Sequence, residues 1–248
     1  MSPLYEWLLD GSAGPGTLER MLLGINWTMA EVDGGCGFAF SPREVPRTLP
    51  WAGTLVGRQA AELRAWLLSW NPAEAAVGLA TLNAQVNRDS ALLADAQPLA
   101  ALVPGHLQVF AHFRPRLAGR LVVVVGRYPG LDELWQDQPY QCLERAPQAG
   151  DWPDTAAEYL LPRADWVFVT ASSLANKSLP RLLELSRSAT VVLMGPSLPW
   201  LAGWERFGVD YLAGVRVLSP GAAWQVAAEG GGTRLFAGPV QYALAALG

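Results

Sequence analysis

The fold class is decided by the stretch Leu121-Val-Val-Val-Val125, which is followed at once by Gly126-Arg-Tyr-Pro-Gly130. A continuous β-branched run without polar residues is typical of a strand that is covered on both faces. The glycine-containing segment after it predicts a turn, and residues 131–136 predict a helix. Together they indicate one strand–turn–helix unit of a parallel sheet.

The same alternation continues toward the C-terminus. Further strands are expected at residues 140–144, 165–170, 190–194 and 210–218, and further helices at residues 178–188 and 220–228. Thr155 and Glu158 have the spacing of a capping box, which predicts a short helix ending before Pro162. Strands that alternate with helices in this way predict the α/β class, with a doubly wound parallel sheet.

The first hundred residues show a different pattern. Residues 3–9 predict a short helix, and residues 20–42 predict a β-hairpin with its turn at 33–35. Helices are expected over 57–70 and from Pro72 onward, where Asn71 would be the N-cap. Residues 91–118 contain three prolines and are interpreted as a connection. We therefore expect an α+β domain at residues 1–105 and the parallel-sheet domain at residues 106–248.

Charged residues are sparse in this chain. Of 248 residues 16% are charged, against a usual share of roughly 25%, and the net charge is -4. Lysines and arginines do not cluster, so no nucleic-acid partner is expected. The small number of charges also predicts that a partner or a second copy covers part of the apolar surface, which favours a homo-oligomer.

Apolar runs and cysteines bear on the cellular compartment. Runs such as Leu121–Val125 are far shorter than the roughly 18 residues that a membrane span needs, so no membrane partner is expected. The two cysteines, Cys36 and Cys142, are too few and too far apart for a disulfide framework. A reducing cytoplasm is the predicted location.

Candidate binding residues follow from the rule that ligands of open α/β sheets lie at the carboxyl ends of the strands. Two loops there carry hydroxyl and amide groups, and helix N-termini that favour anions follow such loops. The first contains Thr170, Ser172, Ser173 and Asn176; the second contains Gly195, Pro196 and Ser197. An alternative interpretation is that these residues are only caps and turns.

Cofactor motifs are not evident. Arg127, Tyr128 and Pro129 fill the space between Gly126 and Gly130, so the glycine fingerprint of a standard NAD site is not met. The only histidines, His106 and His112, lie six residues apart in the connection and predict no metal site. Cys36 is interpreted as a packed side chain rather than a nucleophile.

Several segments together resemble the family described as putative heavy-metal chelation. They are Gly24–Thr28, Gly78–Ala84, Thr170–Asn176, Gly195–Pro199, Leu212–Gly214 and Glu229–Gly232. The resemblance implies an enolase N-terminal-like domain followed by a Rossmann-like domain, with a site in the cleft between them. It points to Asn83, Thr170, Asn176, Gly195, Pro196 and Ser197 as site residues, and to a metal ion or metal chelate as ligand.

Three functions are compatible with these observations. The first is binding of a metal or metal-containing small molecule in the interdomain cleft, which the resemblance favours. The second is an enzyme for a small anionic metabolite, with Ser172, Ser173 and Ser197 orienting the substrate and Asn83 supplying an amide from the facing domain. The third is an assembly scaffold that uses exposed apolar side chains, including some of the 11 tryptophans.

Overall fold

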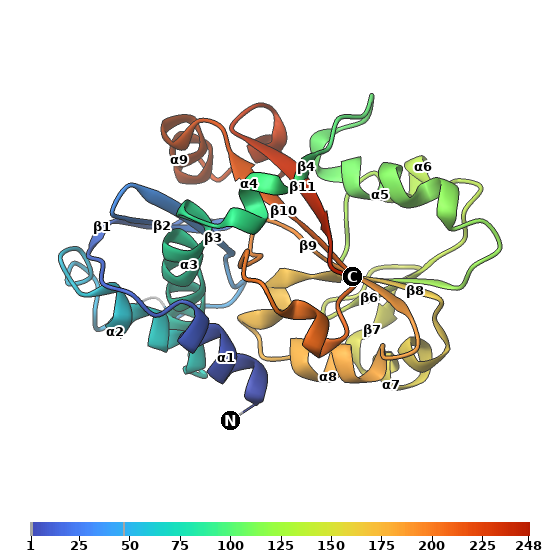
Figure 1. Cartoon of the computed structure of the whole chain (residues 1–248), viewed down its shortest axis with the longest axis horizontal. Coiled ribbons are helices and arrows are strands. Elements are labelled where there is room, and N and C mark those ends of the chain that lie inside the picture. The colour runs from blue at the N-terminus through green and yellow to red at the C-terminus, as the bar shows by residue number, and fades with distance from the viewer. Residues whose placement is uncertain (1, 47) are drawn as a thin grey trace.

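The computed structural model describes residues 2–46 and 48–248. These residues form a three-stranded sheet, in the order β1-β2-β3, and an eight-stranded sheet, in the order β4-β11-β10-β9-β8-β5-β6-β7. Figure 1 shows the small sheet with its helices beside the large sheet with its own helices. The predicted fold class is confirmed: a small α+β unit is followed by a Rossmann-like unit.

The described residues contain the following elements. The strands are β1 (Leu18–Leu23), β2 (Trp27–Val32), β3 (Gly35–Phe40), β4 (Gln97–Pro98), β5 (Val122–Val125), β6 (Gln141–Glu144), β7 (Trp152–Pro153), β8 (Trp166–Thr170), β9 (Thr190–Met194), β10 (Tyr211–Val217) and β11 (Val240–Ala246). The α-helices are α1 (Pro3–Gly11), α2 (Ala60–Arg64), α3 (Pro72–Arg88), α4 (Ala91–Asp95), α5 (Gln108–Phe113), α6 (Leu131–Leu134), α7 (Ala157–Leu160), α8 (Leu179–Leu185) and α9 (Pro220–Ala228). None of these helices is long and apolar enough to span a membrane.

The large sheet reverses its winding between β5 and β8. From β5 the chain moves outward through β6 to β7, and it then returns to the other side of β5 and continues through β8, β9 and β10. All neighbours in this series pair in parallel. A topological switch point of this kind is where α/β sheets bind ligands.

Both faces of the large sheet are covered, as the β-branched run predicted. Side chains of alternate residues enter different cores: Val167 and Val169 pack with residues of α7 and α8, whereas Phe168 packs with residues of α5. Figure 1 shows α5 and α6 on one side of the sheet and α7 and α8 on the other.

The large sheet is mostly parallel, as predicted, and it has two antiparallel pairings at one edge. β11 pairs antiparallel with β10, and β4 pairs antiparallel with β11. Neither strand was predicted, because β4 is only two residues long and β11 is rich in alanine. The chain thus joins the large sheet at Gln97, within the segment interpreted as a connection, and the rest of that segment includes α4 and α5.

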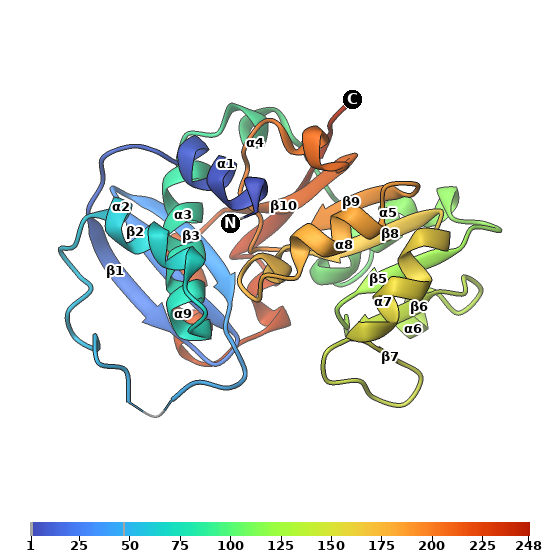
Figure 2. The same cartoon turned by 90° about the horizontal axis from the view of Figure 1, so that it is seen from below.

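The small sheet has one strand more than the predicted hairpin. The run 22–32 is broken after β1, where Gly24 N donates to Trp27 O over 3.1 Å and Ile25 is 80% exposed. The turn between β2 and β3 is confirmed, with positive φ at Asp33 and Gly34. The sheet lies between α3 on one face and α9 on the other, as Figures 1 and 2 show.

Helix α3 begins as predicted and packs very closely on the small sheet. The side chain of Asn71 accepts hydrogen bonds from the backbone N–H groups of Ala73 and Glu74. At Gly37 of β3, an added Cβ would lie 2.2 Å from the backbone of Ala80 and Ala84. Only glycine fits between β3 and α3 at this point.

Two helix predictions need correction. The helix expected over 57–70 is shorter, because α2 turns into a 3-10 helix at Ala65–Leu68. The capping box is not formed: the helical segment starts after Pro153, and the carboxylate of Glu158 binds Arg181 instead. Glu158 thus forms an ion pair with Arg181 of α8 and does not cap its own helix.

Candidate functional site

Thr170 lies at the carboxyl end of β8, at the switch point of the large sheet. Its Oγ1 is 2.9 Å from Ser172 Oγ, and both residues are half-buried. Glycines end the strands on either side: an added Cβ at Gly126 would lie 3.1 Å from Thr170 Cγ2, and one at Gly195 would lie 3.9 Å from Thr170 Oγ1. Backbone atoms of two glycines thus lie beside Thr170, whose hydroxyl also contacts the side chains of Ser172 and Tyr128.

The small unit covers this edge of the sheet through the loop after β9. Ser197 Oγ accepts a hydrogen bond from Phe40 N over 2.9 Å. Asn83 Nδ2 donates to Ser197 O over 3.0 Å and to Phe38 O over 2.7 Å. The structure therefore brings Asn83 and Ser197 together, and both side chains are buried.

The contact continues along one face of α3 and into α4. Asn87 Nδ2 donates to Leu198 O over 3.2 Å, and Asn87 Oδ1 accepts from Trp200 N over 2.9 Å. Ser90 Oγ donates to Trp200 O over 2.7 Å. Side chains at intervals of about one helical turn thus bind the backbone of residues 197–200. Asn83 is the innermost member of this series.

The other predicted residues lie in the loop after β8 and in the buried start of the β9 loop. Ser173 Oγ donates to Thr170 O over 2.6 Å, and Asn176 Oδ1 accepts from both N and Oγ of Ser178. Gly195 and Pro196 are buried. Ser173 and Asn176 therefore make these hydrogen bonds within their own loop, and Asn176 is exposed whereas Asn83 is buried.

Two further segments of the resemblance meet at the opposite face of the small sheet. Asn26 Nδ2 donates to Gly230 O over 2.7 Å, and Trp27 Nε1 donates to Gly232 O over 3.1 Å. An added Cβ at Gly24 would lie 2.6 Å from Ala227 O. Through these hydrogen bonds and this close packing, the small sheet contacts the C-terminal end of α9.

A cavity of about 440 Å³ also lies between the units. Its walls come from the loop at residues 11–15, the end of α3, the start of α4 and residues 200–202. None of the eight predicted site residues is among its lining residues. Its size falls in the range of small-molecule sites.

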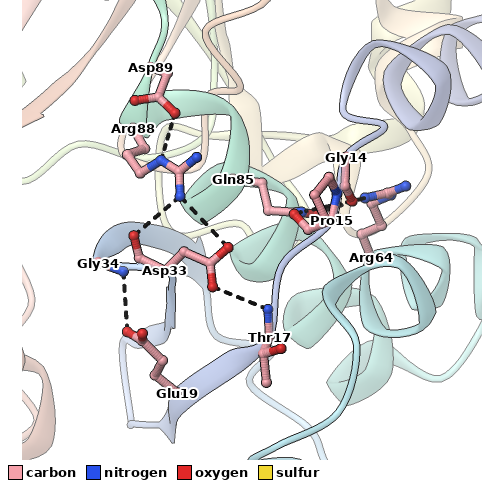
Figure 3. A network of polar contacts seen from close by, with 10 residues as sticks. All are labelled: Gly14, Pro15, Thr17, Glu19, Asp33, Gly34, Arg64, Gln85, Arg88 and Asp89. Atoms are coloured by element: carbon pink, nitrogen blue, oxygen red, sulfur yellow. Dashed lines mark hydrogen bonds and ion pairs between the residues drawn. The ribbon is translucent and has the colours of Figure 1, made fainter.

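The charged groups beside this cavity are already paired, as Figure 3 shows. Arg88 Nε lies 2.6 Å from the carboxylate of Asp89, and Arg88 Nη1 donates to Asp33 O over 3.2 Å. Gln85 accepts from Arg64 and donates to Gly14 O and Pro15 O. Arg88 is thus paired with Asp33 and Asp89, whereas Arg64 of the same network donates to the neutral oxygens of Gly14 and Gln85.

The side chains that usually hold heavy metals do not gather in the part of the chain that the structure describes. No three His, Cys, Asp or Glu residues within it come together as a metal site. Burial raises the pKa of Cys36 and of Cys142 to about 12, so both thiols stay protonated. Because metals bind the thiolate, these cysteines are poor ligands.

Two residues in the loops at this edge of the sheet were missed by the sequence reasoning. Burial raises the pKa of Tyr128 to about 12, although its hydrogen bond with Thr170 opposes that rise. Tyr128 is therefore a neutral phenol beside the switch point. Lys177 follows Asn176 with a positive φ of 67°, and a non-glycine residue in that conformation is uncommon. The signal available in the sequence was that Lys177 is the only lysine.

Replacing Gly195 by alanine should lower stability by about 1–2 kcal/mol, because its φ of 111° disfavours any side chain. Chemical denaturation of the variant would measure this loss. Gly248→Ala, where nothing lies within 4 Å and φ is not positive, is the matched control. Equal stability of the two variants would contradict the prediction.

Comparisons with known proteins extend over nearly the whole chain. A family model named DUF364 and described as "Putative heavy-metal chelation" matches residues 108–246. A second model, DUF4213, has the same description and matches residues 5–86. No curated protein matches the chain.

Two solved structures are similar throughout. One is a protein with unknown function from the DUF364 family of Desulfitobacterium hafniense, with a TM-score of 0.86, 26% identity, and coverage of 98% of this chain and 97% of that chain. The other, from Pyrococcus horikoshii, has a TM-score of 0.76 and 19% identity and covers 98% of both chains. At the lower identity the likeness concerns the fold alone.

Proposed function

The chain belongs to the family described as "Putative heavy-metal chelation", and from this premise we propose that it binds a metal-containing small molecule at the interface of its two units. The proposed site is the carboxyl edge of the large sheet around the switch point. Its proposed binding residues are Asn83, Thr170, Ser172, Ser173, Asn176, Gly195, Pro196 and Ser197.

One observation carries this proposal. The loops that follow β8 and β9 both contact the small unit: Leu174 O accepts from Tyr5 OH over 2.7 Å, and Ser197 Oγ accepts from Phe40 N. The edge where ligands of this sheet type bind is thus the edge that the small unit covers. A ligand there would touch both units, as a cleft site requires.

The side chains at this edge favour a metal that is already bound by a chelating molecule. Hydroxyl and backbone groups line this edge, whereas heavy metals with a preference for sulfur or imidazole need Cys or His. Such groups suit the outer oxygen atoms of a chelating molecule, because hydroxyls and backbone N–H groups bind carboxylates and hydroxyls by hydrogen bonds. The proposed ligand is therefore a metal chelate rather than a bare ion.

Equilibrium dialysis with metal analysis tests the proposal. We expect the protein to retain nickel supplied as nickel citrate and to retain at least tenfold less nickel supplied as the aqueous ion. Thr170→Val combined with Ser172→Ala should reduce retention of nickel citrate about tenfold, since about 1.4 kcal/mol of hydrogen bonding is lost. No retention of nickel citrate above background would contradict the proposal.

Two controls locate the site within the interface. Thr155→Val changes an exposed threonine just after β7, the outermost strand of the large sheet, and should leave retention unchanged. Ala202→Trp places a large side chain at the wall of the 440 Å³ cavity. Retention that survives Ala202→Trp but not the Thr170/Ser172 change supports the carboxyl edge; the reverse result supports the cavity.

We also propose that the protein is located in a reducing cytoplasm. Cys36 and Cys142 are both free thiols. This agrees with a compartment in which disulfides do not persist.

A further inference from the structure

Lys177 occupies an unfavourable backbone conformation in the loop that follows β8. Its φ is 67°, and among the described residues the only other non-glycine residue with positive φ is Asp33 of the β2–β3 turn. L-residues pay a steric cost in this region, and glycine does not. The hydrogen bonds of Asn176 Oδ1 to Ser178 N and Oγ hold the turn in which Lys177 lies.

The side chain of Lys177 is also in an unfavourable environment. It is half-buried, and Nζ donates to Ala175 O over 2.9 Å. Burial lowers the pKa of Lys177 to about 8. No salt bridge found in residues 2–46 and 48–248 includes Lys177. The half-buried ammonium group thus has one carbonyl oxygen as its hydrogen-bond partner, where a charge removed from water is usually paired with a carboxylate.

The backbone of Lys177 lies close to the interface of the two units. Leu174 O accepts hydrogen bonds from both Tyr5 OH, over 2.7 Å, and Lys177 N, over 3.2 Å. The backbone of Lys177 thus lies beside α1, on the loop that begins at Thr170. Locally unfavourable residues of this kind are concentrated at functional sites.

We infer that Lys177 binds an anionic group, a carboxylate or a phosphate, of the small molecule held at the carboxyl edge of the large sheet. The inference rests on the proposed function and adds the chemical class of the ligand. An anion beside Nζ would supply the missing counter-charge, and the hydroxyls of Thr170 and Ser172 lie on the same loop to bind its oxygen atoms. A polycarboxylate chelator meets both requirements.

The test uses citrate and inorganic phosphate as separate probes, with calorimetric titration of the full chain. We expect the wild type to bind at least one of them, and the arm that binds identifies a carboxylate or a phosphate ligand. Lys177→Gly should weaken that binding at least tenfold. The melting temperature of this variant without anion should stay the same or rise, because glycine adopts a φ of this sign without steric cost.

Lys177→Asn is the second variant, because asparagine tolerates the left-handed region and carries no charge. It should lose binding as Lys177→Gly does. Arg187→Gln removes one positive charge from an exposed residue just before β9, at the opposite edge of the sheet, and should bind like the wild type. A purely structural lysine would instead give a lower melting temperature in both Lys177 variants, with unchanged affinity.

The inference is overturned if the wild type binds neither probe, or if both Lys177 variants bind as tightly as the wild type. Failure of the proposed function gives a different result. In that case citrate or phosphate binds and depends on Lys177, but nickel citrate is not retained in dialysis. The two failures are thus distinguishable from one set of proteins.

Discussion

Gly37→Ala is expected to destabilise the protein by about 3 kcal/mol or more. The added Cβ would lie 2.2 Å from Ala80 O and from Ala84 N, both of which belong to the backbone of α3. A backbone cannot rotate away as a side chain does, so the whole helix would have to move from β3, and overpacking of this kind is costly. Urea denaturation followed by circular dichroism would measure the change.

Gly221→Ala is the matched control for this experiment. Gly221 lies in α9, its φ is not positive, and nothing lies within 4 Å of an added Cβ. Alanine there should be neutral or stabilise by up to about 1 kcal/mol, because it favours the helix. If Gly37→Ala denatured at the same urea concentration as Gly221→Ala, the close contact between β3 and α3 would be refuted.

The second large effect is expected for Asn83→Asp. Asn83 Nδ2 donates to Phe38 O and Ser197 O, and the side chain is fully buried. A carboxylate would face the same two carbonyl oxygens without a proton to donate. Loss of both hydrogen bonds together with a buried unpaired charge should cost about 4 kcal/mol at pH 8.

This loss should depend on pH. Burial and the two carbonyl oxygens disfavour the ionised form, so the pKa of the introduced carboxyl would be raised in the folded state. The folded variant then holds its proton to higher pH than the unfolded variant. Its stability should therefore recover as the pH is lowered through the folded pKa, and the deficit should be smaller at pH 5 than at pH 8.

Asn87→Asp provides the comparison one turn along α3. An aspartate there can still accept from Trp200 N, so only the bond to Leu198 O is lost, at a cost of about 1 kcal/mol. Denaturation curves of both variants at the two pH values separate the effects. Equal losses at the two positions, or a loss at Asn83 that ignores pH, would refute the buried contact between Asn83 and Ser197.

The parts of the fold that were predictable have strong local signals. Leu121–Val125 is β-branched throughout, and Asn71-Pro72 has the chemistry of a helix start, so strand β5 and the start of α3 could be located from the sequence. The break after β1 was missed because Ile25 continues an apolar run, yet its side chain is exposed. Apolar character alone does not show that a residue points inward.

The candidate site shows a similar limit. The resemblance pointed to Asn83 and Ser197 before their contact was visible, but their partners are backbone carbonyl and amide groups, which have no signature in a sequence. Lys177 stood out in the sequence only as the single lysine, because the inference about it depends on a backbone angle and on the salt bridges found among the described residues. Contacts made by the backbone of distant segments can be known only from the structure.

The pairing at the outer edge of the large sheet determines which fragment of the protein can be expressed alone. β11 is the strand beside β10, and its other edge is covered by Gln97–Pro98, which precede the first parallel strand by more than twenty residues. A fragment that started at residue 106 would leave the backbone groups of β11 open to strands from other molecules, a known cause of aggregation. Expression of the Rossmann-like unit by itself therefore calls for a fragment that begins upstream of Gln97.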